Sequence, residues 1–331
     1  VTGLTVGGPL NFELASDKFF DDFFRFGMMS DWVAEEAINT TVDLVPDGTD
    51  NQKAVLTLGA EFVNLVPGTM CRFTPTGGDP INVQITSVDT PSTVFTVATM
   101  RDEIAVSETL DISIPSYLDI GALQQSAHVG KSYLDLQHLE TTDNHSQTYG
   151  GTLVSGFTVE ANTGEIVTGN FETSGNSYLQ EAPSLEQLVV AAGGTVNPQG
   201  TANPINSSID IGLVTSDDVA TDYCIQSLSI TLDNGLSEQL CLGKAAPTRY
   251  DLGTAAVSVS MSLYATDPAY DFFMPAKISQ EPVSITYVAE NQAGGYIFHI
   301  EAMQLSFPDP AATGQNEQTF IEAEGVGKVG E

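Results

Sequence analysis

Residues 151–171 read GTLVSGFTVEANTGEIVTGNF, and this stretch decides the fold class. Phe157 and Val159 alternate with polar neighbours, which is the period of a strand with one buried face. The turn residues Asn162-Thr163-Gly164 follow, and the next segment places Val167 and Phe171 on one side. An alternating run, a turn and a second apolar run together predict a β-hairpin.

The same alternation returns further along the chain. Apolar residues at 228, 230 and 232 alternate with hydroxyl residues before a second predicted turn at 233–235, and the cleanest alternation covers 257–264. Strands are also predicted at 283–289, 296–307 and 318–323, with a short helix at 268–274 between them. The fold class we predict is therefore mostly β: an antiparallel sandwich or barrel with one or two marginal helices.

The first forty residues differ from this β-rich remainder. Phe19, Phe20, Phe23, Phe24 and Phe26 fall on one broad helical stripe within residues 12–32. Ser16 or Asp17 would serve as the N-cap. A helix with so apolar a side must be buried, and we expect core packing rather than an intersubunit groove.

Residues 41–114 carry a second set of short β-branched runs separated by turn signals. The runs are 54–58, 81–88 and 94–99, and the turns include Pro46-Asp47-Gly48 and Gly77-Gly78. We interpret this region as an inserted small β-module. The predicted domains are an N-terminal arm and helix (1–40), the inserted module (41–114) and a β-sandwich core (115–331).

Charge restricts the function. The 43 acidic residues outnumber the 10 lysines and arginines and give a formal net charge of −33. Such a surface repels nucleic acid and anionic membranes, so a protein that grips phosphate is disfavoured. Two compatible interpretations stay open. The acid could keep the protein soluble in a halophilic host, where salt screens its self-repulsion, or it could line a channel through which DNA slides without sticking.

Motifs for catalysis or cofactor binding are incomplete. Gly130-Lys131-Ser132 lacks the first glycine of a phosphate loop, because Gln125 stands there. Residues 325–330 read GVGKVG and match G-x-G-x-x-G, but no helix can follow them, so we expect a flexible tail. We predict that the chain is not an enzyme and uses no cofactor.

Metal binding is not expected either. His138 and His145 flank Glu140 and Asp143, but their spacing matches no helical ligand pair, and we interpret the segment as a solvated acidic loop. The turn at 47–51 departs from the calcium-loop pattern.

The remaining markers leave alternatives open. Cys224 and Cys241 bracket a predicted hairpin, so they are either a disulfide or, like Cys71, free thiols. Three N-x-[ST] sequons occur, at Asn39, Asn144 and Asn206. The chain opens at Val1 without a secretory pattern, and we expect it to come from a longer or processed product.

Three stretches together resemble the major tail tube proteins of long non-contractile-tailed, siphovirus-like phages. The first is VGGPLNFEL at 6–14 with the aromatic helix and Trp32. The second is the hairpin at 151–171, whose return strand reads I-V-T-G-x-F, and the third is 227–236 with Tyr270-Asp271-Phe272-Phe273.

The resemblance implies a structural subunit without catalytic residues. Such subunits close into hexameric rings, share strands in an inner β-barrel and stack into a tube in the virion, assembled in the host cytoplasm. Viral DNA crosses the lumen without sequence-specific binding, and the partners are a tape-measure protein and terminator and baseplate proteins, with no membrane. The strands expected to assemble carry Phe157, Val159, Val167, Phe171, Leu228, Ile230, Val257, Val259, Met261 and Leu263.

Two other classes of protein fit the composition. A cell-surface or pilus-like β-sandwich protein would also be acidic and rich in strands. A carbohydrate-binding β-sandwich module would use exposed aromatic residues, but Tyr264, Tyr287 and Tyr296 lie in predicted strands without a matching polar constellation.

Overall fold

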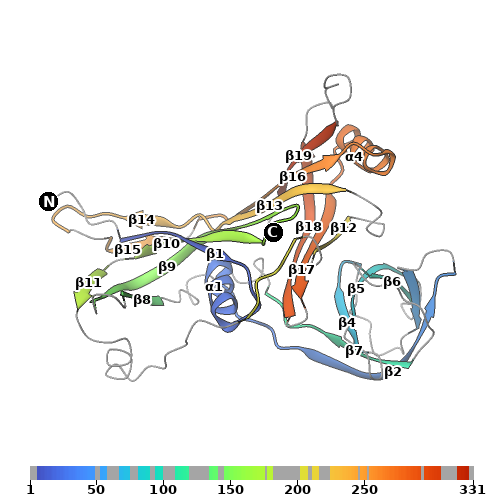
Figure 1. Cartoon of the computed structure of the whole chain (residues 1–331), viewed down its shortest axis with the longest axis horizontal. Helices are drawn as coiled ribbons and strands as arrows, with labels where there is room; N and C mark the ends of the chain where they lie inside the picture. Colours follow the sequence, from blue (N-terminus) through green and yellow to red (C-terminus); the bar gives the residue numbers. More distant parts are fainter. Residues whose placement is uncertain are drawn as a thin grey trace.

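Over the residues that it describes, the computed structural model is mostly antiparallel β with two helices, which confirms the predicted fold class (Figure 1). It describes residues 6–48, 53–57, 67–74, 81–89, 94–99, 109–118, 134–140, 145–175, 177–181, 202–207, 211–215, 224–244, 247–251, 253–291, 294–306 and 319–327. Within these ranges the chain forms a large curled sheet, a short ribbon and a small closed barrel.

The large sheet has eleven strands. They are β1 (Val6–Glu13), β8 (Leu134–Glu140), β9 (His145–Asn162), β10 (Thr168–Gly175), β11 (Ser177–Glu181), β12 (Ile211–Thr215), β13 (Ile225–Asp233), β16 (Ala256–Tyr264), β17 (Val283–Asn291), β18 (Gly294–Ser306) and β19 (Phe320–Gly327). The order is β1-β10-β9-β13-β16-β19-β18-β17-β12, and β8 and β11 pair with the first half of β9. The predicted hairpin is thus β9–β10, with Phe171 opposite Phe157.

Helix α1 (Lys18–Met28) lies against the apolar face of this sheet. Asp17 caps it by accepting hydrogen bonds from the backbone nitrogens of Phe19 (2.8 Å) and Phe20 (3.3 Å), as the sequence predicted. Met29 ends it in the left-handed conformation, with φ of 51°. The buried side of the helix is phenylalanine, so its burial supplies the hydrophobic stabilisation that a short helix needs.

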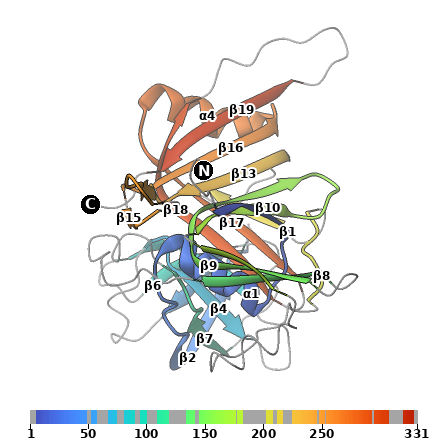
Figure 2. The same ribbon diagram turned by 90° about the vertical axis from the view of Figure 1, so that its left-hand side faces the viewer.

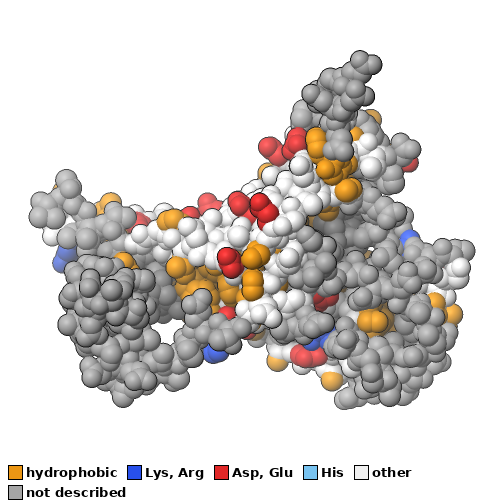
Figure 3. Space-filling view, viewed as in Figure 1, with side chains coloured by type: hydrophobic (Ala, Val, Ile, Leu, Met, Phe, Trp, Pro, Cys, Tyr) orange, Lys and Arg blue, Asp and Glu red, His pale blue; other side chains and the backbone are white. Residues whose placement is uncertain are grey.

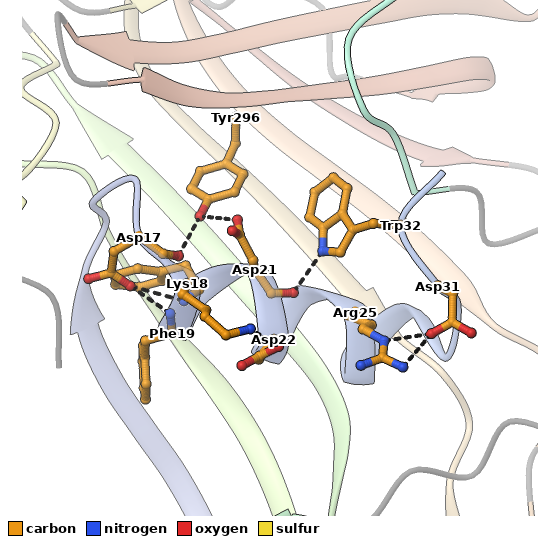
Figure 4. A network of polar contacts seen from close by, with 10 residues as sticks. Asp17, Lys18, Phe19, Asp21, Asp22, Arg25, Asp31, Trp32 and Tyr296 are labelled. Atoms are coloured by element: carbon orange, nitrogen blue, oxygen red, sulfur yellow. Dashed lines mark hydrogen bonds and ion pairs between the residues drawn. The ribbon is translucent and has the colours of Figure 1, made fainter. Parts of the chain in front are cut away.

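Polar contacts join α1 to β18 and to the segment that follows the helix (Figure 4). The Tyr296 hydroxyl, from β18, donates to Asp21 Oδ1 at 2.9 Å, and Trp32 Nε1 donates to the Asp21 carbonyl at 3.0 Å. Burial raises the pKa of the Asp21 carboxyl, although the hydrogen bond from Tyr296 opposes this shift. Arg25 pairs with Asp31 just after the helix ends.

The core between α1 and the sheet is built around Phe171. This side chain is fully buried, and its ring centroid lies 4.6 Å from that of Phe12, 4.8 Å from Phe23 and 5.2 Å from Phe24. Gly169 explains part of the I-V-T-G-x-F pattern, because a Cβ there would collide with the Phe12 ring and the neighbouring strand. The glycine therefore makes room for the aromatic cluster.

The inserted region forms a closed barrel. Its strands are β2 (Glu36–Pro46), β3 (Lys53–Thr57), β4 (Met70–Thr74), β5 (Ile81–Val88), β6 (Val94–Thr99) and β7 (Thr109–Ile114). They follow the order β2-β3-β6-β5-β4-β7, and β7 closes the barrel on β2. Its own core includes Leu56, Phe73 and Cys71, whose burial raises the thiol pKa to about 12. The domain boundaries at 40/41 and 114/115 stay predictions.

The barrel docks on β17 and β18 through polar side chains. Gln84 Nε2 donates to Thr286 Oγ1 at 3.0 Å, both residues being buried, and Thr286 Oγ1 is 2.8 Å from His299 Nδ1. Asn82 Nδ2 donates to Glu290 at 2.5 Å beside them. On β17 these contacts lie on the strand face opposite Tyr287 and Ala289, whose side chains belong to the core shared with α1. The barrel and α1 therefore pack on opposite faces of this part of the sheet, and in the views of Figures 1 and 2 the barrel lies in the lower part of the molecule.

Several details differ from the sequence predictions. Residues 325–327, expected in a flexible tail, belong to β19, because Met303 from β18 fills the space beside Gly325. The predicted turn at 233–235 instead opens a ribbon of β14 (Ser237–Gln239) and β15 (Arg249–Asp251). The short helix is α4 (Asp267–Ser279), longer than predicted. Cys224 and Cys241 are free and exposed, so no disulfide joins them.

Candidate functional site

The side of the large sheet that faces away from α1 is the most distinctive surface of the molecule. We call it the polar face: the outward side chains of β1, β10, β9, β13, β16 and β19. Its exposed carboxylates belong to Glu13, Glu160, Glu172, Asp233, Glu322 and Glu324. Serine, threonine and asparagine fill most of the positions between them. Strand alternation produces this arrangement, because the apolar partners of these residues all point into the core.

Strand register aligns the polar residues in rows that cross the sheet. One row consists of Glu13, Thr168, Glu160, Ser229, Ser260 and Glu324. The next row consists of Asn11, Asn170, Thr158, Thr231, Ser258 and Val326. With neighbouring strands about 4.8 Å apart, each row spans roughly 24 Å. The polar face is therefore a continuous hydroxyl and carboxylate surface.

The face has local contacts but no cationic side chain. Thr158 Oγ1 and Thr231 Oγ1 lie 3.1 Å apart, and Ser262 donates to Glu322 Oε1 at 2.8 Å. The sequences of its strands contain neither lysine nor arginine. Figure 3 shows red carboxylates on white polar surface along the upper margin of the sheet, with the blue side chains elsewhere. The carboxylates are thus uncompensated within the face.

Two hollows of about 430 Å³ and 400 Å³ open on this face. Glu13 and Glu160 line the first, and Ser262 and Glu322 line the second. Among the described residues no three histidine, cysteine or acidic side chains gather as a metal site would require. The side chains of His138 and His145 and all of His128 and Asp143 lie outside the described residues.

The large sheet has open borders. Within the described part of the chain, β1 pairs only with β10 and β12 pairs only with β17. In this part of the chain, the outer edge of β1 therefore carries backbone N–H and C=O groups without a partner strand. Such an edge can pair with a strand of another chain. Pro9 suits this position, because proline in a sheet is confined to edges and strand starts.

The residues predicted for the assembly strands lie mainly in the core. Nine are buried, and Val257 is half-buried. The nine are Phe157, Val159, Val167, Phe171, Leu228, Ile230, Val259, Met261 and Leu263. These side chains hold the sheet on α1, whereas their polar neighbours form the exposed face. A role of these strands in assembly stays a prediction. The sequence feature that would have identified the exposed face is the set of acidic and hydroxyl residues that alternate with these apolar ones.

Comparison with known protein families shows which family the chain belongs to. A family model described as phage tail tube protein matches residues 1–326. The chain belongs to this family. A comparison with curated proteins found no match. As a phage tail tube protein it is a structural component of a virion tail. Its copies self-assemble into a tube, and the tube has other virion proteins as partners.

Family membership bears on two of the predictions made from the sequence. The resemblance to tail tube proteins is confirmed, and the family match covers nearly the whole chain, inserted barrel included. A structural family agrees with the prediction that the chain is not an enzyme. No helix among the described residues has the length and apolar character to cross a membrane.

Proposed function

We propose that copies of this tail tube protein close into hexameric rings, that the rings stack, and that the polar face lines the lumen through which viral DNA passes. The observation that carries the proposal is the row of uncompensated carboxylates and hydroxyls on strands without lysine or arginine. The number six rests on the family resemblance alone.

The charge of the face suits passage rather than binding. DNA binds proteins largely because cationic side chains neutralise phosphates and release counterions. Glu160 and Glu324 would instead repel the phosphates, and the serine and threonine hydroxyls between them would keep a hydrated wall. DNA could then slide without being held at any one ring.

The open borders of the sheet support ring closure. Among the described strands β1 has a partner on one side only, and such an open edge is an aggregation hazard in a free monomer. Pairing it with a border strand of a neighbouring copy satisfies those groups, and rotation about one axis closes the ring without leaving an edge. On this arrangement α1, which packs on the sheet opposite the polar face, lies toward the outside of the tube.

Further parts of the proposal rest on the resemblance and on composition. The tube would belong to a siphovirus-like tail, enclose a tape-measure protein, contact terminator and baseplate proteins, and assemble in the host cytoplasm. The charge of −33 supports a halophilic host, because molar salt screens repulsion between copies.

Charge reversal on the polar face tests the proposal. Tubes of the double variant Glu160→Lys/Glu324→Lys are expected to retain short duplex DNA that nuclease cannot digest, whereas wild-type tubes retain none. The matched control is Glu35→Lys/Glu36→Lys, which reverses two exposed carboxylates beside the barrel. Equal nuclease protection in the control, or none in the polar-face variant, would show that the face does not line the lumen.

A further inference from the structure

The ribbon β14–β15 extends the two central strands of the polar face beyond the end of the sheet. β13 ends at Asp233 opposite Ala256 of β16, and the ribbon continues from both (Figure 1). Its tip carries two leucines that are almost wholly in water: Leu240 is 70% exposed and Leu242 is 106% exposed. Leaving such side chains in water forgoes most of the stabilisation that their burial would give.

The base of the ribbon is firmly held. Asn234 is fully buried, and its Nδ2 donates to the carbonyls of Gly27 (3.0 Å) and Val154 (2.8 Å). Gly235, with φ of +66°, accepts a hydrogen bond from the Gly253 nitrogen at 2.9 Å. A Cβ at either glycine would press on the other strand. These contacts fix the direction in which the ribbon leaves the sheet, and so the position of its tip.

The opposite end of the same strands carries a second exposed apolar side chain. β16 ends at Tyr264, and α4 follows it directly. Ile278, in the last turn of α4, is 82% exposed. Figure 1 shows the ribbon at the left end of the molecule and α4 at the upper right.

We propose that the ribbon tip of one copy contacts the α4 end of the next copy, with Leu240 and Leu242 packed against Ile278, and that this contact stacks successive rings. The inference rests on the proposed tube. A contact between two different surfaces at opposite ends of a molecule propagates along one direction, as stacking requires.

Charge also favours a second copy as the occupant. Lys244 is exposed at the tip. Exposed carboxylates of Asp271 and Glu281 lie on α4 and just beyond its end, beside half-buried Lys277. With ten basic residues in the whole chain, a lysine at the tip is well matched to the acidic surface of another copy.

A native cysteine makes the contact testable. Cys241 lies between the two leucines and is exposed. In a Cys224→Ser background, Ile278→Cys tubes treated with a mild oxidant should form a disulfide between Cys241 and the introduced cysteine of another copy. A ladder of covalent oligomers on a non-reducing gel would report it. The control Val45→Cys, at an exposed barrel position, should give no ladder through Cys241.

Variants separate stacking from ring formation. Leu242→Asp and Ile278→Asp should each raise the critical concentration for tubes at least about 30-fold, the loss typical of an interface hot spot. Both should still form single rings by negative-stain microscopy, whereas Val45→Asp should form tubes like the wild type. Normal tubes from Leu242→Asp, or no ladder from Ile278→Cys, would overturn the inference and leave the tube intact. A wild-type chain that forms neither rings nor tubes would overturn the proposed function as well.

Discussion

Replacement of Asn234 should expose how the polar face, α1 and the ribbon depend on one another. The side chain is fully buried where β13 leaves the sheet. Its Nδ2 donates to the carbonyl of Gly27, in the last turn of α1, and to the carbonyl of Val154, in β9. Its Oδ1 accepts a hydrogen bond from the Leu236 nitrogen at 3.2 Å. Truncation to alanine removes the side-chain donor from both carbonyls.

The magnitude follows from those hydrogen bonds. Each neutral hydrogen bond contributes about 1 kcal/mol, and a buried carbonyl left without a donor costs about 1–3 kcal/mol. Asn234→Ala should therefore lower the free energy of unfolding by about 2–4 kcal/mol. Asn234→Asp should lower it further at pH 7, because a carboxylate has no proton to donate and would face two carbonyl oxygens. Acid should partly restore the Asp variant, since its protonated form regains one donor.

Urea unfolding of the dilute, unassembled chain measures this effect. Trp32 is the single tryptophan and bonds to α1, so its fluorescence follows the region in question. The control Asn11→Asp, on the exposed face, should stay within about 0.5 kcal/mol of the wild type. If Asn234→Asp matched the wild type at pH 7, or exceeded Asn234→Ala in stability, the assigned hydrogen bonds would be wrong.

Three further results are expected. Phe171→Ala should cost about 3–5 kcal/mol in the same assay, because it empties the centre of the aromatic core; a loss below 1 kcal/mol would contradict that packing. Since burial raises the pKa of Asp21, the folded state loses stability as pH rises through its unfolded value of about 3.8, so the stability of Asp21→Asn relative to wild type should increase between pH 3 and 7. A relative decrease would reverse the assigned shift. Molar salt should promote tube formation, measured by sedimentation, and dissociation of tubes there would count against the halophilic interpretation.

Alternation predicted the strands well because it reflects burial on one face. The runs ending at Val159, Leu232 and Leu263 all became strands of the large sheet, and the phenylalanine stripe became α1. The pairing of β13 between β9 and β16 could not be predicted, because register depends on contacts between segments far apart in sequence. Closure of the barrel by β2 and β7 is a long-range contact of the same kind.

The flexible tail predicted from residue 325 onward was wrong for residues 325–327. Gly325 and Gly327 suggested a flexible tail, but they are inward positions of β19 where Met303 and Ile300 already fill the space. The assembly strands show a similar effect. Their apolar residues were the easier ones to recognise, yet the structure uses these to hold the core and leaves the hydroxyls and carboxylates for the surface. Only the fold shows that those polar residues share one face.

The most direct measurement is a cryo-electron microscopy map of tubes assembled from the full chain. We expect a lumen wall formed by the strands that carry Glu160, Ser229, Ser260 and Glu324, with α1 on the outside. A map in which these side chains face outward, or in which lysines and arginines line the channel, would contradict the account.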